Sequence, residues 1–174
     1  CNIESEGGFL KIFIYPGTFD PFTKGHVDIA RRAVGICDKL YIAILTNSSK
    51  NVVFSVEERV HMAKVSLEEF ENIEVESFDG LLVDYFKLKN ACAVVRGLRS
   101  ESDFRYEAEL AAANKLLLAD FESVLLPCRM DLAFTSSSIV KEVASYGGNI
   151  SGMVSEKIVE MITNKLAGRK LKSM

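Results

Sequence analysis

The 174-residue sequence predicts an α/β fold, a single Rossmann-like domain with a parallel five-stranded sheet and helices on both faces. Three observations lead to this prediction. Short β-rich runs alternate with longer runs at helical spacing, as in βαβ units. Residues 39–45 are apolar enough for a strand covered on both faces. No internal repeat, low-complexity tract or linker interrupts the pattern, and the length suits one domain.

Each predicted element has its own signal along the chain. The β-rich runs place strands at residues 10–15, 39–45, 72–77, 91–95 and 123–126. Helical spacing places helices at residues 25–37, 55–71, 81–89, 103–119, 138–146 and 155–166. Ser55 and Glu58 form a capping box at the start of the second helix, and Pro127 ends the last strand. Ligands of such sheets bind beyond the carboxyl ends of the strands, so the strand-to-helix turns are the places to search.

Composition excludes several classes of protein. The formal net charge of −3 argues against a general nucleic-acid binder, and no apolar run approaches the ~20 residues of a membrane span. The four cysteines are scattered, and with two histidines they complete no metal-ligand spacing. We therefore expect free thiols, a cytoplasmic protein and no resident metal site. The expected domain covers residues 9–167, with residues 1–8 a loose extension or cloning remnant and residues 168–174 a solvated basic tail.

The first strand-to-helix turn has the parts of a phosphate site. Gly17 allows close approach of the backbone to a ligand, and Thr18 offers an N–H and a hydroxyl. Gly25 and His26 open the next helix, whose unpaired N–H groups favour an anion. The turn matches neither the dinucleotide fingerprint nor the Walker A loop. A capped turn with a surface histidine is the simpler alternative, but so many special residues in the first loop favour a functional site.

Two further turns carry groups suited to phosphate. Arg96 and Arg99 flank a glycine directly after a buried strand, and two such forks can grip two phosphates. Residues 136–138 are three serines at a helix start, more hydroxyls than one N-cap requires. The alternatives are solvated arginines and an ordinary cap. Lys50, in the turn after the second strand, is by itself an ordinary surface lysine.

Together these segments resemble a known family. Residues 17–26, with Gly17-Thr18-Phe19-Asp20-Pro21 and Gly25-His26, are similar to the signature of the nucleotidyltransferase superfamily, which includes a T/H-x-G-H element. Three more segments are similar to the phosphopantetheine adenylyltransferases: Ser49-Lys50 before residues 54–59, Arg96-Gly97-Leu98-Arg99 before residues 103–107, and Ser136-Ser137-Ser138 before residues 140–143. The matches run in order from about residue 11 to residue 166, and residues 96–107 distinguish this branch from its sister enzymes.

The resemblance implies a role for each matched residue. His26 would stabilise the transition state together with Lys50. Thr18, Lys50, Leu82 and Arg96 would bind the phosphopantetheine substrate. The residues implied for ATP are Thr18, Phe19, His26, Gly97, Leu98, Arg99, Glu107, Leu132, Ala133, Phe134, Thr135, Ser136, Ser137 and Ser138. Glu107 would hold the ribose or an arginine.

The implied reaction transfers AMP from ATP to 4′-phosphopantetheine, giving dephospho-coenzyme A and pyrophosphate. The resemblance also implies Mg²⁺ carried with ATP, a homohexamer, and inhibition by coenzyme A. Because the attacking phosphate is already anionic, Asp20 need not act as a general base. Two alternatives are a sister enzyme acting on nicotinamide mononucleotide or a cytidylyl substrate, and a regulatory module that has lost its chemistry. A synthetase fragment is disfavoured, because no anticodon-binding region is present.

Overall fold

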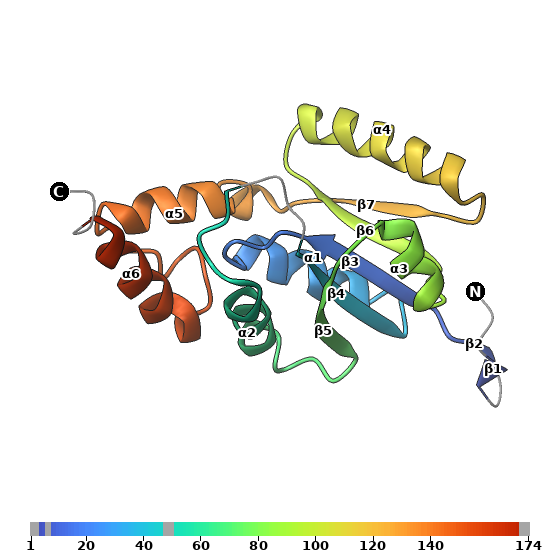
Figure 1. The fold of residues 1–174 in the computed structure, drawn as a ribbon, viewed down its shortest axis with the longest axis horizontal. Coiled ribbons are helices and arrows are strands. Elements are labelled where there is room, and N and C mark those ends of the chain that lie inside the picture. The colour runs from blue at the N-terminus through green and yellow to red at the C-terminus, as the bar shows by residue number, and fades with distance from the viewer. Residues whose placement is uncertain (1–3, 6–7, 47–50, 171–174) are drawn as a thin grey trace.

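The computed structural model describes residues 4–5, 8–46 and 51–170. Five strands form one parallel sheet in the order β5-β4-β3-β6-β7, as the alternating pattern predicts (Figure 1). Their bounds are β3 Ile12–Gly17, β4 Lys39–Leu45, β5 Ile73–Phe78, β6 Ala93–Leu98 and β7 Ser123–Pro127. The strand that carries the first turn therefore lies at the centre of the sheet.

Within the described residues, six α-helices connect and flank these strands. They are α1 Lys24–Val34, α2 Val56–Ser66, α3 Leu82–Leu88, α4 Glu101–Leu117, α5 Ser137–Ser145 and α6 Glu156–Lys170, with a short 3₁₀ turn η1 at Met130–Leu132 that the pattern did not predict. The capping box of α2 is present, since the Ser55 N–H donates to Glu58 Oε2 at 2.7 Å. This helix ends at Ser66 rather than Glu71, because Leu67 and Phe70 pack on the core from the following loop.

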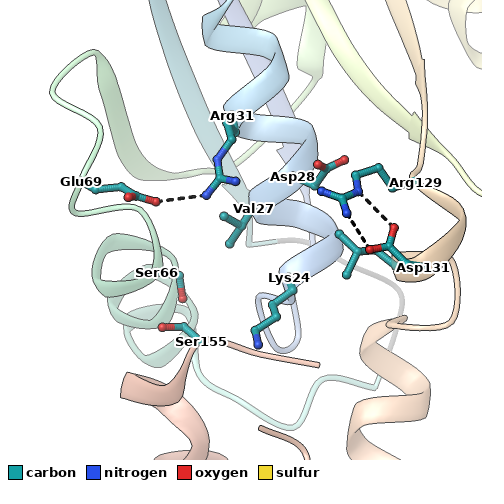
Figure 2. A pocket seen from close by; sticks show the side chains of 10 residues that line it. Lys24, Val27, Asp28, Arg31, Ser66, Glu69, Arg129, Asp131 and Ser155 are labelled. Atoms are coloured by element: carbon teal, nitrogen blue, oxygen red, sulfur yellow. Dashed lines mark hydrogen bonds and ion pairs between the residues drawn. The ribbon is translucent and has the colours of Figure 1, made fainter. Parts of the chain in front are cut away.

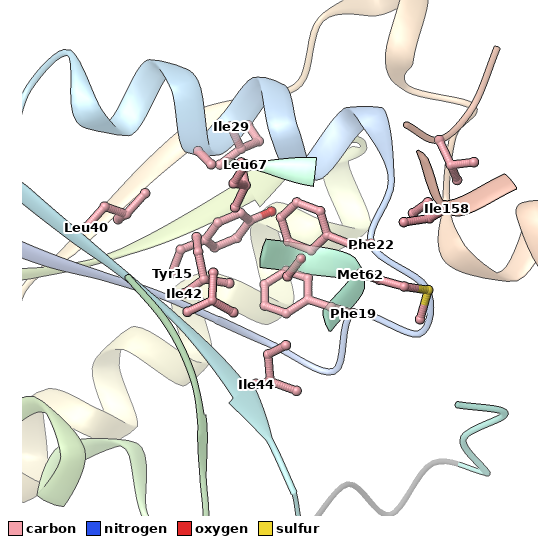
Figure 3. Close-up of a cluster of buried hydrophobic side chains, with 14 of the residues drawn as sticks. Tyr15, Phe19, Phe22, Ile29, Leu40, Ile42, Ile44, Met62, Leu67 and Ile158 are labelled. Atoms are coloured by element: carbon pink, nitrogen blue, oxygen red, sulfur yellow. The ribbon is translucent and has the colours of Figure 1, made fainter. Parts of the chain in front are cut away.

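Two hydrophobic clusters hold helices to both faces of the sheet. The larger one joins β3 and β4 to α1 and α2 and extends to α5 and α6; Figure 3 shows its centre, with Tyr15, Phe19 and Phe22 beneath α1. The smaller one packs Val83 and Phe86 of α3 against the opposite face. We call these the α1 side and the α3–α4 side of the sheet. None of the described helices is both long enough and apolar enough to cross a membrane.

At the periphery of the fold, one expectation is wrong, because one of the cysteines is not a free thiol. Helix α6 continues to Lys170, and Lys165 Nζ contacts Glu58 Oε1 at 2.6 Å. Within residues 1–8, β1 (Glu4–Ser5) pairs antiparallel with β2 (Gly8–Phe9). Cys92 is disulfide-bonded, whereas Cys37 and Cys128 are free. The Cys92 N–H donates to Ile12 O at 2.7 Å, so Cys92 lies beside the start of β3, although the two residues are far apart in the sequence.

Candidate active site

The crevice of the sheet lies beyond the carboxyl ends of β3 and β6. These strands are neighbours although they are not consecutive, with Phe13 opposite Ala93 and Ile14 opposite Val94. Strands β4 and β5 follow on one side of β3 in the sheet, and strand β7 follows on the opposite side, beyond β6. Such a reversal opens a crevice at the carboxyl edge, where doubly wound folds bind ligands. The topology therefore brings the loop 18–23 and the segment 96–100 together.

Alternation along β6 directs Arg96 to one side of the sheet, and Arg99, the first residue after the strand, acts on the other side. Successive side chains of a strand point to opposite faces. Val94 belongs to the core of the α3–α4 side and Val95 to that of the α1 side. Arg96 accordingly meets Glu107 of α4, whereas the charge of Arg99 acts on His26 of α1. The three-residue spacing thus places one guanidinium on each side of the crevice.

Gly97, between the two arginines, permits the close approach of α1 to β6. A Cβ added at Gly97 would lie 3.1 Å from Ile29 Cγ1 of α1 and 3.7 Å from Cys128 Sγ. Cys128 follows β7, and its N–H donates to Leu98 O at 2.7 Å. The segment 97–98, the turn after β7 and helix α1 therefore meet at one point on the α1 side.

His26 is held in one orientation at the start of α1. Thr23 is the N-cap, and its N–H donates to His26 Nδ1 at 3.0 Å, while the His26 N–H donates to Thr23 Oγ1 at 3.4 Å. Because Nδ1 accepts a hydrogen bond, the proton of the neutral ring is on Nε2. Burial and the nearby Arg99 charge lower the pKa of His26 to about 3. The ring is therefore neutral near pH 7 and presents an N–H donor.

Arg96 is held by an ion pair with two parallel hydrogen bonds. Its Nε and Nη2 donate to the two carboxylate oxygens of Glu107 at 2.6 Å each, and its Nη1 donates to Pro16 O at 3.0 Å. This fork geometry restricts the guanidinium more than a single contact would. Of the two roles implied for Glu107, holding an arginine is the one this contact displays. Arg99 is more exposed, and its backbone N–H and Nε donate to Asp103 Oδ2 at 3.0 and 3.4 Å.

The loop after β3 is held by buried charges that sequence reasoning assigned no role. Asp20 Oδ1 accepts from the Phe54 N–H at 2.9 Å, and Asp20 Oδ2 accepts from Lys141 Nζ at 2.6 Å. Arg59, only 1 % exposed, donates to Thr18 O, Leu45 O and Phe54 O at 2.7, 3.0 and 3.1 Å. Asp20 is thus a structural anchor. The side chain of Phe19 is buried in the core, which leaves its backbone as the part better placed to meet a ligand.

The start of α5 lies beside the start of α1. A Cβ added at Gly25 would lie 2.9 Å from Thr135 Oγ1 and 3.6 Å from Leu132 O. Ser136 is the N-cap of α5, accepting from the Ile139 N–H at 3.3 Å, and Ser137 Oγ donates to Pro21 O at 2.9 Å. Two helix N-termini consequently adjoin the same crevice, an arrangement that favours anions.

The remaining predicted residues differ in their exposure. Ser138 and Phe134 are exposed, and Leu132, Ala133 and Leu98 are half-buried. Leu82 is the first residue of α3 and packs partly on the α3–α4 core. Lys50 lies outside the described residues.

A pocket of about 320 Å³ lies on the outer flank of α1 rather than over the crevice (Figure 2). Its charged lining is largely neutralised: Arg31 pairs with Glu69 at 3.4 Å and Arg129 with Asp131 at 2.7 Å. It includes neither His26 nor Arg96. We therefore place the candidate site at the crevice.

Sequence reasoning missed Thr23, Arg59 and Lys141. The spacing Thr23-x-x-His26 is a visible signal, since it is that of a capping box with histidine in the usual place of glutamate. The partners of Arg59 and Lys141 lie 5 to 121 residues away in the chain, and no local pattern reports such contacts.

Comparison with known proteins adds evidence of two kinds. Residues 14–143 match the family model described as cytidylyltransferase-like. A curated protein of Desulfosudis oleivorans, named phosphopantetheine adenylyltransferase, is 46 % identical over 157 residues, covering 90 % of this chain and 94 % of that protein. A protein of the same name from Desulforamulus reducens is 48 % identical over 156 residues, covering 90 % and 97 %.

Solved structures with low identity share the fold. Nicotinic acid mononucleotide adenylyltransferase of Plasmodium falciparum, complexed with NaAD, has a TM-score of 0.66 at 15 % identity and covers 94 % of this chain and 97 % of that one. A bifunctional NMN adenylyltransferase/ADP ribose pyrophosphatase of Francisella tularensis, complexed with AMP and a manganese ion, has a TM-score of 0.65 at 14 % identity; the match covers 94 % of this chain and 54 % of that one.

Proposed function

This chain belongs to the phosphopantetheine adenylyltransferases, nucleotidyltransferases of coenzyme A biosynthesis, and from that premise we propose how its residues transfer the adenylyl group. An anionic phosphate oxygen of 4′-phosphopantetheine attacks the α-phosphorus of ATP. One P–O bond forms there, the bond to the β-phosphate oxygen breaks, and the products are dephospho-coenzyme A and pyrophosphate. No proton must be removed from the nucleophile, so positioning and charge stabilisation account for the catalysis.

The main observation behind this proposal is that the crevice has two sides, each with its own arginine. On the α3–α4 side, Arg96 and Leu82 bind the phosphopantetheine substrate, with Glu107 holding the Arg96 fork in place. On the α1 side, Thr18, Phe19 backbone, His26, Gly97, Leu98 and Arg99 bind ATP, and the adenine end lies toward residues 132–138. Two reactants that meet from opposite sides of one sheet edge are suited to an in-line displacement.

We propose that His26 stabilises the transition state as a neutral donor. With Nδ1 accepting from Thr23, the Nε2–H is free to donate to an α-phosphate oxygen as its charge grows. The capping box sets the direction of the ring before ATP binds, so little reorganisation is needed at the moment of reaction. Lys50 is proposed to contact the transferring phosphates from the turn after β4.

The metal requirement is proposed to be Mg²⁺ that enters with ATP. Among the described residues no group of three or more histidine, cysteine or acidic side chains could hold a metal ion. Asp20, the acidic residue of the first loop, is already occupied by backbone N–H groups and Lys141. Mg²⁺ is therefore proposed to arrive and leave with the phosphates, as part of the Mg–ATP substrate.

Assembly as a homohexamer is also proposed, with coenzyme A as an inhibitor and the cytoplasm as location. Helix α4, which stands beside β7 and α3 at the edge of the molecule in Figure 1, buries only Asn114 of its 17 residues. Phe104, Tyr106, Leu116 and Leu117 are 53 to 91 % exposed. Such an apolar surface on a helix that carries Glu107 supports a contact between subunits.

Pyrophosphate release tests the proposed substrate choice. The protein is incubated with Mg–ATP and either 4′-phosphopantetheine, nicotinamide mononucleotide or glycerol phosphate. Release with 4′-phosphopantetheine alone is the expected result. Release with nicotinamide mononucleotide instead would support the sister activity, and absence of release with all three would support a regulatory module.

A further inference from the structure

The hydroxyl group of Tyr15 lies in the crevice, and none of the residue roles proposed for adenylyl transfer uses it. The residue is 5 % exposed, and its ring packs edge-on against Phe19 with centroids 5.2 Å apart. No described residue makes a hydrogen bond with the hydroxyl. Among the described residues only Ser66 Oγ is a fully buried side-chain polar atom without a hydrogen-bond partner, so the unpartnered Tyr15 hydroxyl keeps a small exposed area. Figure 3 shows this oxygen directed away from Leu40, toward the end of the cluster that holds Phe19 and Phe22.

The surroundings of this hydroxyl belong to the crevice. Tyr15 is the third residue from the end of β3, and its ring lies 6.4 Å from that of His26, centroid to centroid. The charges that act on it come from Cys128, Arg96, Arg99 and Glu107, all at the carboxyl edge of the sheet. Burial raises the pKa of Tyr15 well above its ordinary value, so the group is a neutral donor at pH 7.

A tyrosine hydroxyl in a buried setting usually has a hydrogen-bond partner, and phenylalanine would fill the same apolar space without that need. Beside two arginines and a histidine N–H, the expected partner is an oxygen of an anionic or hydroxylated ligand. We propose that the Tyr15 hydroxyl donates a hydrogen bond to an oxygen of the ribose or phosphate portion of the nucleotide. This inference rests on the proposed adenylyl transfer and adds a residue to its ATP site.

Strand alternation assigns Tyr15 to the nucleotide rather than to the acceptor. Tyr15 belongs to the α1-side core, as do Ile29 and Val95, whereas Ile14 and Val94 belong to the α3–α4 side. His26 and Arg99 share its side. The charges of Arg96 and Glu107 also act on Tyr15, but these two side chains pair with each other. A hydrogen bond from Tyr15 to ATP and none to phosphopantetheine follows from this placement.

The test is Tyr15→Phe, which removes the hydroxyl and keeps the ring. Titration calorimetry measures binding of ATP, adenosine and 4′-phosphopantetheine, and calorimetry of unfolding measures Tm. We expect ATP affinity to fall about five- to tenfold, the value of one hydrogen bond, with 4′-phosphopantetheine affinity and Tm not lowered. A matching loss with adenosine assigns the bond to the ribose, and a loss confined to ATP assigns it to a phosphate.

The matched control is Tyr85→Phe, whose hydroxyl bonds Glu76 within the protein. It should lower Tm and leave ATP affinity unchanged. Unchanged ATP affinity and turnover in Tyr15→Phe would overturn the inference, as would a lowered Tm or an equal loss for 4′-phosphopantetheine. The proposed function fails on separate grounds, if the wild-type protein releases no pyrophosphate with 4′-phosphopantetheine.

Discussion

The two sides of the crevice are built by different means. On the α1 side, His26 is uncharged and is held by the hydrogen bonds of a capping box. It packs beside aromatic side chains of the core, and the buried Arg59 and Asp20 hold the neighbouring loop. On the α3–α4 side, Arg96 is fixed by Glu107, which comes from a helix that buries one residue in the isolated chain. The first side is preorganised by the core of a single chain, whereas the second depends on a helix with one buried residue.

The largest expected effect tests the support of the α1 side. Asp20→Ala leaves Lys141 and the Val53 and Phe54 N–H groups without their partner. Breaking one half of a buried ion pair costs about 3–5 kcal/mol of unfolding free energy. Urea denaturation measures this loss. A wild-type stability in Asp20→Ala would show that the loop is held by its apolar contacts alone.

His26→Ala should lower kcat by about 10²–10³-fold, the effect of losing one preorganised donor, with ATP affinity nearly unchanged. Single-turnover adenylyl transfer and ATP titration separate the two quantities. The controls are His26→Asn and His26→Gln, which are expected to retain part of the rate because a neutral amide also donates a hydrogen bond. Wild-type kcat in His26→Ala would refute the proposed role, and variants all as slow as Ala would favour a general base.

The arginine pair tests the division directly. Arg96→Ala should weaken 4′-phosphopantetheine far more than ATP, and Arg99→Ala should do the reverse. The loss of a charge-assisted hydrogen bond predicts about 1.5–3 kcal/mol in each case, or roughly 10- to 150-fold in Kd. Calorimetric titration of both ligands measures it, with Arg105→Ala, an exposed site on α4, as the control. Equal weakening of both ligands by either variant would contradict the two-sided site.

The depressed pKa of His26 predicts a pH effect on stability. Between about pH 6.5 and pH 3 the unfolded chain binds a proton at this ring that the folded chain does not. The free energy of unfolding should therefore fall as the pH decreases through this window, by on the order of 1 kcal/mol per pH unit at most. Urea denaturation at pH 7.5, 6 and 5 should show a smaller decline for His26→Asn than for wild type. Parallel declines would show that His26 is not buried in its neutral form.

The smallest effect is expected for Cys128→Ser. Burial raises the pKa of this thiol, so the reactive thiolate is disfavoured at neutral pH, although Sγ lies near Gly97 in the crevice. Turnover should stay within about twofold of wild type, as for most substitutions without a specific contact. A larger loss in single-turnover transfer would require a role for Cys128 on the α1 side.

Several features of the fold were predictable because their signals are local. The alternating runs indicate five strands and six helices, and the capping box of α2 begins that helix at the expected residue. The end of α2 was not predictable, because Leu67 and Phe70 keep a helical spacing while packing from a loop. Nor was the disulfide bond of Cys92, since the distance between cysteines in a sequence says nothing of their distance in space.

The candidate site also has parts that a local sequence pattern predicts and parts that it does not. The sequence alone predicted which turns form the candidate site, because glycine, histidine, arginine and serine at strand ends and helix starts leave a local pattern. Tertiary structure decided that Arg96 and Arg99 face opposite sides, that Glu107 holds one of them, and that Asp20 serves the loop rather than the reaction. The physical reason is that strand order and buried ion pairs join residues far apart in the chain, and only the packed fold brings those residues together.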